Sequence, residues 1–265
     1  MNCAAKGVMV APMPNTSSVS SAVALGRINV LKMELDALRP LNAQTIRALD
    51  DWHRVELTYS SNAIEGNTLT RSETAVILEK GLTVGHGKSV REHLEAINHG
   101  HAFDFVRRLA AGAEAISEMD IRQVQALITA GDERAEPGRY SSGARTVSGS
   151  KRIFPGPSEI GPLMQDFARW LAEEKPSPDT AVEAHSRLVE IHPFSDGNGR
   201  TARLLMNAVL WRGFYPPAIV EPADRAAYID TFELRHDGDK EPHRAFMLNC
   251  VLASAERYLA VVRKR

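Results

Sequence analysis

A twelve-residue run from His192 to Arg203 concentrates side chains that can do chemistry. It holds a histidine, a carboxylate four residues later at Asp196, an asparagine between two glycines, and two arginines three residues apart. Histidine titrates near neutral pH and can act as a general base. One carboxylate together with substrate phosphates is a usual way for a protein to hold Mg²⁺. The run therefore predicts a site that binds a nucleotide with Mg²⁺ and removes a proton.

The glycines and arginines of the run are suited to phosphate. Gly197 and Gly199 let the backbone turn so that N–H groups converge at the start of the next helix, where the helix dipole favours anions. Arg200 and Arg203 share one helix face, and each guanidinium can donate two hydrogen bonds to phosphate oxygens. An isolated glycine turn is usually ordinary loop chemistry. The run lacks the ligand series of an EF-hand, the lysine of a Walker loop and the second histidine of a zinc helix.

Apolar residues at helical spacing indicate the elements that position this run. They recur from Ile28 to Leu38 and, past Pro40, from Ile46 to Tyr59. Capping-box patterns at Thr70 and Ser89 each predict the start of another helix. Further helices are predicted over 118–130, 158–174, 180–191, 200–212, 224–235 and 242–262. The fold class predicted is mostly α.

Residues 138–157 are the exception to the helical pattern. Glycine and proline are too dense there for a helix, and two short β-type stretches, Arg145–Val147 and Arg152–Phe154, flank Ser148-Gly149-Ser150. The segment therefore predicts one β-hairpin on an otherwise helical protein.

Composition narrows the class of protein. The 265 residues are 43% hydrophobic and 25% charged, as in ordinary globular proteins. The net charge of −1 gives no bulk attraction to nucleic acid or to an anionic membrane, so neither is an expected partner. Two cysteines form no metal or disulfide pattern and no window approaches transmembrane length, so a cytoplasmic protein is expected. We expect a disordered tail over 1–23, a helical region over 24–114 and a catalytic core over 115–265.

The run from His192 to Arg203 resembles the signature of the Fic family, H-x-F-x-D/E-G-N-G-R-x-x-R, at every specified position. The resemblance implies a Fic-type helical bundle with a hairpin flap, which transfers AMP from ATP to a Ser, Thr or Tyr hydroxyl of a target protein. It implies that His192 deprotonates the hydroxyl and that Asp196 binds Mg²⁺, or Mn²⁺ in its place. The implied ATP contacts within the run are Gly197, Asn198, Gly199, Arg200, Thr201, Ala202 and Arg203.

A second, distant motif runs from Ser61 to Gly66 and resembles the family's inhibitory helix, S/T-x-x-x-E-G/N. The resemblance implies that Glu65 pairs with Arg203 and occupies the place needed for the γ-phosphate of ATP. Some relatives use the same carboxylate to activate water and remove AMP from a modified protein. Glu65 can therefore restrain one direction of the reaction and assist the other.

Two further segments resemble parts of the family that contact substrates. The predicted hairpin matches the flap, which implies target docking by strand addition at Arg145, Thr146, Val147 and Phe154, with Val147 near the nucleotide. The stretch from Asp224 to Asp239 resembles the part that contacts adenosine, so Tyr228 and His236 are candidate nucleotide contacts. Here Ile229 stands where a second tyrosine is frequent and His236 where asparagine is common, which leaves the recognition of adenine open.

Two other functions remain open at the level of sequence. Doc-like relatives transfer phosphate and tend to carry lysine in place of the second glycine of the run, so Gly199 argues against that activity. A nucleotide-gated binding module has no use for a base and a metal ligand, so His192 and Asp196 argue against that one. Relatives include monomers and homodimers, and the sequence does not decide between them.

Overall fold

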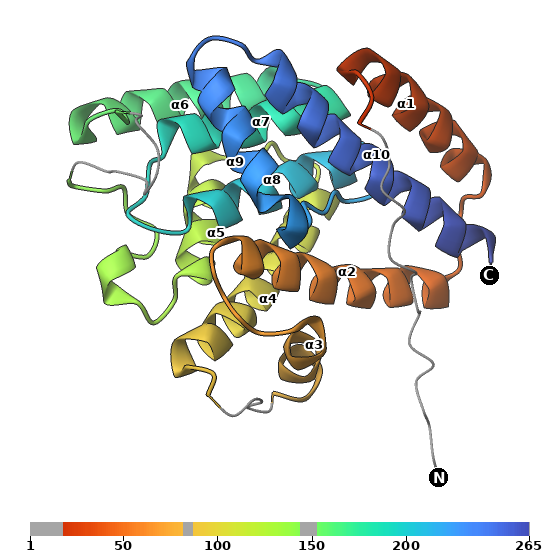
Figure 1. Ribbon diagram of the computed structural model, residues 1–265, viewed down its shortest axis with the longest axis horizontal. Coiled ribbons are helices and arrows are strands. Elements are labelled where there is room, and N and C mark those ends of the chain that lie inside the picture. The colour runs from red at the N-terminus through yellow and green to blue at the C-terminus, as the bar shows by residue number, and fades with distance from the viewer. Residues whose placement is uncertain (1–17, 82–86, 144–152, 265) are drawn as a thin grey trace.

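A computed structural model of the chain describes residues 18–81, 87–143 and 153–264, and these ranges are built almost entirely of helices (Figure 1). The α-helices are α1 (Ser21–Ala37), α2 (Ala43–Ile64), α3 (Arg71–Lys80), α4 (Val90–Ala111), α5 (Glu118–Ile128), α6 (Pro157–Glu173), α7 (Pro178–Ile191), α8 (Asn198–Arg212), α9 (Arg225–His236) and α10 (Glu241–Arg263). Two short 3-10 helices are η1 (Glu133–Ala135) and η2 (Pro222–Asp224). The prediction of a mostly α fold is confirmed.

The helix starts follow from local sequence chemistry. Thr70 and Ser89 each form a complete capping box, in which the hydroxyl accepts the N3 amide and the N3 glutamate accepts the cap amide. The six helices predicted after residue 115 are confirmed, with ends that differ by no more than a few residues. The predicted tail extends too far, because α1 begins at Ser21 and Val19 donates its N–H to Asn249 Oδ1 of α10 at 3.1 Å. The rest of that tail, residues 1–17, lies outside the described residues.

The β-hairpin predicted over 138–157 is not shown. No strand is present in the described parts of this segment, and Arg145, Thr146 and Val147 lie outside them. Where the chain is described, its polar groups bond to neighbouring loops and helices: Ser141 N–H donates to Pro193 O at 2.9 Å and Arg122 Nε to Gly138 O at 2.8 Å. Gly138 lies in a turn at the start of the segment, and Pro157 at its end begins α6.

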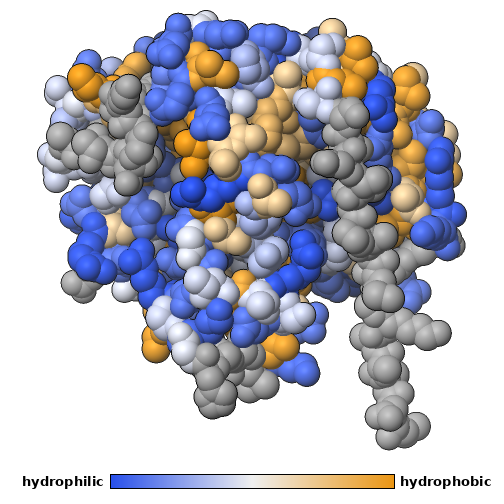
Figure 2. All heavy atoms as spheres, viewed as in Figure 1, coloured by the Kyte–Doolittle hydropathy of each residue, from blue (hydrophilic) through white to orange (hydrophobic). Residues whose placement is uncertain are grey.

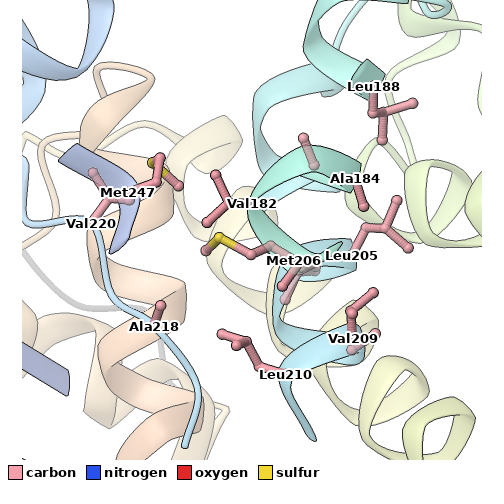
Figure 3. Close-up of a cluster of buried hydrophobic side chains, with 14 of the residues drawn as sticks. Val182, Ala184, Leu188, Leu205, Met206, Val209, Leu210, Ala218, Val220 and Met247 are labelled. Carbon is pink, nitrogen blue, oxygen red and sulfur yellow. The ribbon is translucent and has the colours of Figure 1, made fainter. Parts of the chain in front are cut away.

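Helix α8 lies in the middle of the molecule and contacts α7 most extensively, then α4 and α5 (Figure 1). Every residue from Thr201 to Leu210 is buried, including the polar Thr201, Arg203 and Asn207, so other parts of the protein surround this stretch of the helix. Side chains of α7 and α8 interlock beside Ala218, Val220 and Met247 (Figure 3). Because α8 is fixed on several sides, the loop that precedes it is placed by the core.

Helix α10 departs from the sequence expectation. Within the described ranges it is the one helix whose length and composition would allow it to cross a membrane, although no window of that length was expected. Its apolar side chains Met247, Leu248 and Val251 are fully buried, and the helix packs against α1, α7 and α9. The face of the molecule shown in Figure 2 is mostly hydrophilic, with apolar residues in scattered groups. Packing in the core accounts for the apolar character of α10.

Four buried histidines predict a loss of stability in mild acid. Burial lowers the pKa of His53, His99 and His243 to about 3 and that of His185 well below 6.5. In the unfolded chain the same groups take up protons below about pH 6.5. The free energy of unfolding is therefore highest above that pH and decreases below it, by about 1.4 kcal/mol per histidine at pH 5.5. Urea unfolding should give a free energy lower by several kcal/mol at pH 5.5 than at pH 7.5. Equal free energies at the two pH values would contradict this account.

Candidate active site

The loop between α7 and α8 turns at two residues with left-handed backbone. His192 ends α7 with φ 51° and donates its N–H to Leu188 O at 2.9 Å. Gly197 precedes α8 with φ 81°, and a Cβ there would lie 3.1 Å from Cγ2 of Thr129, the residue that follows α5. Both the backbone conformation and the close approach require glycine at 197. The first amides of α8 have no acceptor within the helix, so they can face an anion.

Asn198 closes this loop from inside. Its Oδ1 accepts the N–H of Phe194 at 3.0 Å, and its Nδ2 donates to the carbonyl of the same residue at 2.8 Å. Phe194 is fully buried, so the two bonds fix the loop against the core. The Asn198 side chain thus holds the loop, and its backbone N–H lies at the start of α8, so the predicted phosphate contact of Asn198 stays a prediction.

Gln125 of α5 supports the loop from the other side and was not predicted. Its Nε2 donates to Asp196 O at 3.0 Å, and its Oε1 accepts the N–H of Gly138 at 2.6 Å. Ser195 adds a bond from its hydroxyl to Ala135 O at 2.7 Å. The available signal was a polar residue among the apolar positions of α5, because a buried amide must find partners.

His192 is held in the tautomer that a base needs. Its Nδ1 lies 3.3 Å from Val189 O. A carbonyl only accepts hydrogen bonds, so Nδ1 carries the proton and the neutral ring has its lone pair on Nε2. Phe154, the one predicted flap residue within the described ranges, packs on this ring with 4.3 Å between centroids. The structure thus brings the candidate base and the end of the predicted flap together.

Asp196 and Arg200 form the next part of the site. Asp196 is 44% exposed and accepts Gly197 N–H at 2.7 Å and Arg200 NH2 at 3.1 Å. Arg200 is buried and also lies 3.8 Å from Glu95 of α4. No group of three or more potential metal ligands exists among the described residues. One exposed carboxylate fits Mg²⁺, which takes its remaining ligands from phosphates and water.

The predicted pair between the two motifs is confirmed. Arg203 NH2 donates to Glu65 Oε1 at 2.7 Å, and its Nε donates to Ser61 Oγ at 2.9 Å. Ser61 also accepts Arg203 NH2 at its backbone carbonyl, at 3.0 Å. The Arg203 side chain is only 5% exposed, and a buried guanidinium needs such partners. Gly66 follows with φ 97°, a backbone angle that favours glycine and turns the chain away from α2.

Glu65 is ionised at neutral pH. Burial raises its pKa, but the Arg203 charge and hydrogen bond, with Arg200 and Arg225 nearby, outweigh burial and hold the pKa below 4.5. The carboxylate is nevertheless 42% exposed, so solvent weakens the pair. A phosphate group therefore competes with an ion pair that is accessible to water.

Gly199 lies directly against this pair. A Cβ at position 199 would be 2.6 Å from Glu65 Oε1 and 3.1 Å from Arg203 NH1. A lysine at 199 therefore cannot coexist with Glu65 in its present position. The NH1 atom is buried without a hydrogen-bond partner in the described part of the chain, so one donor of Arg203 is still unused.

A pocket of about 220 Å³ adjoins Asp196 and Arg200. Its walls come from one face of α4 and from the chain after α5, and they include Arg91, Leu94, Glu95, Asn98, Thr129 and Asp132. This volume lies beside the residues suited to metal and phosphate.

Four of the predicted nucleotide contacts lie outside the loop or point away from it. Thr201 and Ala202 are fully buried, so their side chains face the core of the protein. Tyr228 is 4% exposed and its hydroxyl lies 2.8 Å from His185 Nε2, so it is not open for stacking on a base. The described ring contact of His236 is with Phe232, at 6.4 Å between centroids. The family resemblance alone did not show that the side chains of Thr201, Ala202 and Tyr228 lie in the core.

Known proteins share both the loop and the fold. Residues 115–210 match the model of the Fic/DOC family. The solved Fic-1 fragment from C. elegans (residues 134–508) is 31% identical, with a TM-score of 0.80 over 92% of this chain and 73% of that one. This chain belongs to the Fic family. A Fic domain protein from Bacteroides thetaiotaomicron has the same fold at 26% identity, with a TM-score of 0.82 over 90% of this chain and 98% of that one.

The curated relatives are longer Fic proteins. Protein adenylyltransferase Fic from Drosophila persimilis is 32% identical over 97% of this chain. That match covers 51% of the relative, so the chain spans about half the length of the curated relatives it matches. The match to the Fic family model contains His192 and Arg203 but begins well after α2, so Glu65 is linked to the Fic loop by the structure.

Proposed function

We propose that this Fic chain is a protein adenylyltransferase that moves AMP from ATP to a hydroxyl of a target protein and is restrained by Glu65. The observation that carries the proposal is the 2.7 Å pair between Arg203 of the complete loop and Glu65 of α2. Loop, fold and the names of the curated relatives support the same activity.

The chemistry follows from the geometry of the loop. Nε2 of His192 accepts the proton of the target hydroxyl, and the oxygen attacks the α-phosphorus in line. The bond from that phosphorus to the bridging oxygen breaks, and pyrophosphate leaves. Arg200, Arg203 and the first amides of α8 bind the phosphates. A Mg²⁺ ion at Asp196 would neutralise phosphate charge when bound.

Glu65 restrains this reaction because it occupies Arg203, the arginine that we assign to the γ-phosphate. With Glu65 in place, ATP can bind only if its terminal phosphate displaces a carboxylate from a guanidinium. The same carboxylate, ionised and partly open to water, is suited to deprotonate a water molecule, so removal of AMP from a modified target is part of the proposal.

Target docking is proposed at the segment around 143–154. Phe154 lies on the His192 ring, so an extended peptide aligned along this segment would present its hydroxyl near Nε2. Residues 145–147 lie outside the described residues, so the docking role rests on Phe154 and on the family resemblance.

Labelling with ATP tests the proposal. The Glu65→Gly chain, Mg²⁺ and a cell lysate are incubated with ATP that carries ³²P on either the α- or the γ-phosphate. Relative to lysate without the chain, label on protein should increase with the α-labelled ATP and should not increase with the γ-labelled ATP. Label from the γ-phosphate would indicate Doc-like phosphotransfer. No label from either would favour a nucleotide-gated binding module.

A further inference from the structure

The helix end that carries Glu65 is held by an arginine that the catalytic loop does not supply. Arg225 Nε donates to the carbonyl of Ile64 at 2.6 Å. Ile64 is the last residue of α2, directly before Glu65, and Arg225 is the first residue of α9. A cation that binds the last carbonyls of a helix stabilises its C-terminal turn through both the hydrogen bond and the helix dipole.

The same face of α9 also lies under the partner of Glu65. Tyr228 follows Arg225 by three residues, so both project from one side of the helix. The Tyr228 ring lies 6.0 Å from the Arg203 guanidinium, and its hydroxyl contacts the buried His185. One short helix therefore contacts Arg203 through Tyr228 and the residue before Glu65 through Arg225.

Besides its bonds to Arg203 of α8, the end of α2 is held by hydrogen bonds to α4. Asn62 Nδ2 donates to Glu95 O at 3.2 Å, and Asn67 Nδ2 donates to Glu95 Oε2 at 2.9 Å. These bonds fix the chain before and after Glu65 from the α4 side. Arg225 binds the end of α2 from the α9 side through its bond to Ile64 O. Its charge also favours the ionised form of Glu65.

We propose that Arg225 is a positioning residue that holds Glu65 in its inhibitory place on Arg203. This inference rests on the proposed function, because it assigns Arg225 to the restraint of that activity. Loss of one such hydrogen bond and one helix-end charge should shift the population of released Glu65 by about 2- to 10-fold. Arg225 acts through Glu65, so it should have no effect once Glu65 is gone.

A double-mutant comparison tests this role. AMP transfer is measured for Arg225→Ala with Glu65 intact and in the Glu65→Gly chain. The expected result is a rise of about 2- to 10-fold in the first background and no change in the second. Arg225→Lys should largely restore the restraint, because it keeps the charge and a donor. A matched control is Arg212→Ala, which removes an arginine bound to Leu109 O near the end of α4 and should not raise transfer.

A readout that does not depend on activity separates this inference from the proposed function. The amides of Glu65, Gly66 and Asn67 are bonded to carbonyls of α2, so they should exchange slowly with deuterium. Exchange at 62–67 should become faster in Arg225→Ala and stay unchanged in Arg212→Ala. Unchanged exchange in Arg225→Ala, or equal loss of transfer in both Glu65 backgrounds, would overturn the role of Arg225. If no variant transfers AMP, the proposed function fails, and the exchange result still decides whether Arg225 holds the turn.

Discussion

Replacing His192 with alanine in the Glu65→Gly chain is expected to lower AMP transfer by about 10²- to 10⁴-fold. The imidazole is the described group at the loop that can accept a hydroxyl proton at neutral pH, and Nδ1 is already committed to Val189 O. Loss of Nε2 leaves the target hydroxyl protonated, and a neutral hydroxyl is a poor nucleophile. The measurement is the initial rate of α-label incorporation with saturating ATP.

The control for His192→Ala is ATP affinity. The phosphates are assigned to Arg200, Arg203 and the start of α8, so the dissociation constant for ATP should change little. A rate that stays within about threefold of the parent would exclude His192 as the base, because general-base catalysis contributes far more than that. A large loss of ATP affinity would instead make His192 a binding residue.

Replacing Glu65 with glycine is expected to raise AMP transfer by about 5- to 150-fold over the wild-type chain. That range corresponds to a coupling of about 1–3 kcal/mol between the carboxylate and productive ATP binding. The pair is accessible to water, so the lower half of the range is expected. Arg203 keeps its bonds to Ser61 in this variant, so it remains in position for phosphate.

Glu65→Gln is the matched variant for this prediction. It retains the size of the side chain but loses the charge, so it should fall between wild type and Glu65→Gly. If Glu65→Gln were as restrained as wild type, the restraint would be steric. The reverse activity, removal of AMP from a modified target, should decrease in Glu65→Gly, because this variant lacks the carboxylate that activates water.

Much of the fold was predictable because its signals are local. Capping boxes at Thr70 and Ser89, prolines between elements and apolar spacing each act within a few residues, and each was confirmed. The pairing of Glu65 with Arg203 was also predicted, from the resemblance of two motifs to the Fic family. Chain segments 138 residues apart then met as expected.

The parts that were missed depend on tertiary neighbours. The position of Tyr228 in its helix suits either stacking on the adenine ring or burial in the core. Its contact with His185 shows that it is buried in the core. The bonds of the Asn198 side chain to both backbone groups of Phe194 were not predicted, because only the folded loop brings these groups together. Gln125 and Arg225 bind backbone carbonyls of segments that are distant in sequence. Every residue has a carbonyl, so the residue type at the acceptor position does not indicate such a bond.

The central claim is that Glu65 holds Arg203 away from the γ-phosphate, and comparison of ATP with ADP tests it most directly. Dissociation constants for both nucleotides with Mg²⁺ are measured by titration calorimetry for wild type and Glu65→Gly. ADP lacks the γ-phosphate, so its affinity should be the same in the two chains, whereas ATP should bind about 5- to 150-fold more tightly to Glu65→Gly. Equal changes for ATP and ADP, or no change for either, would contradict the claim.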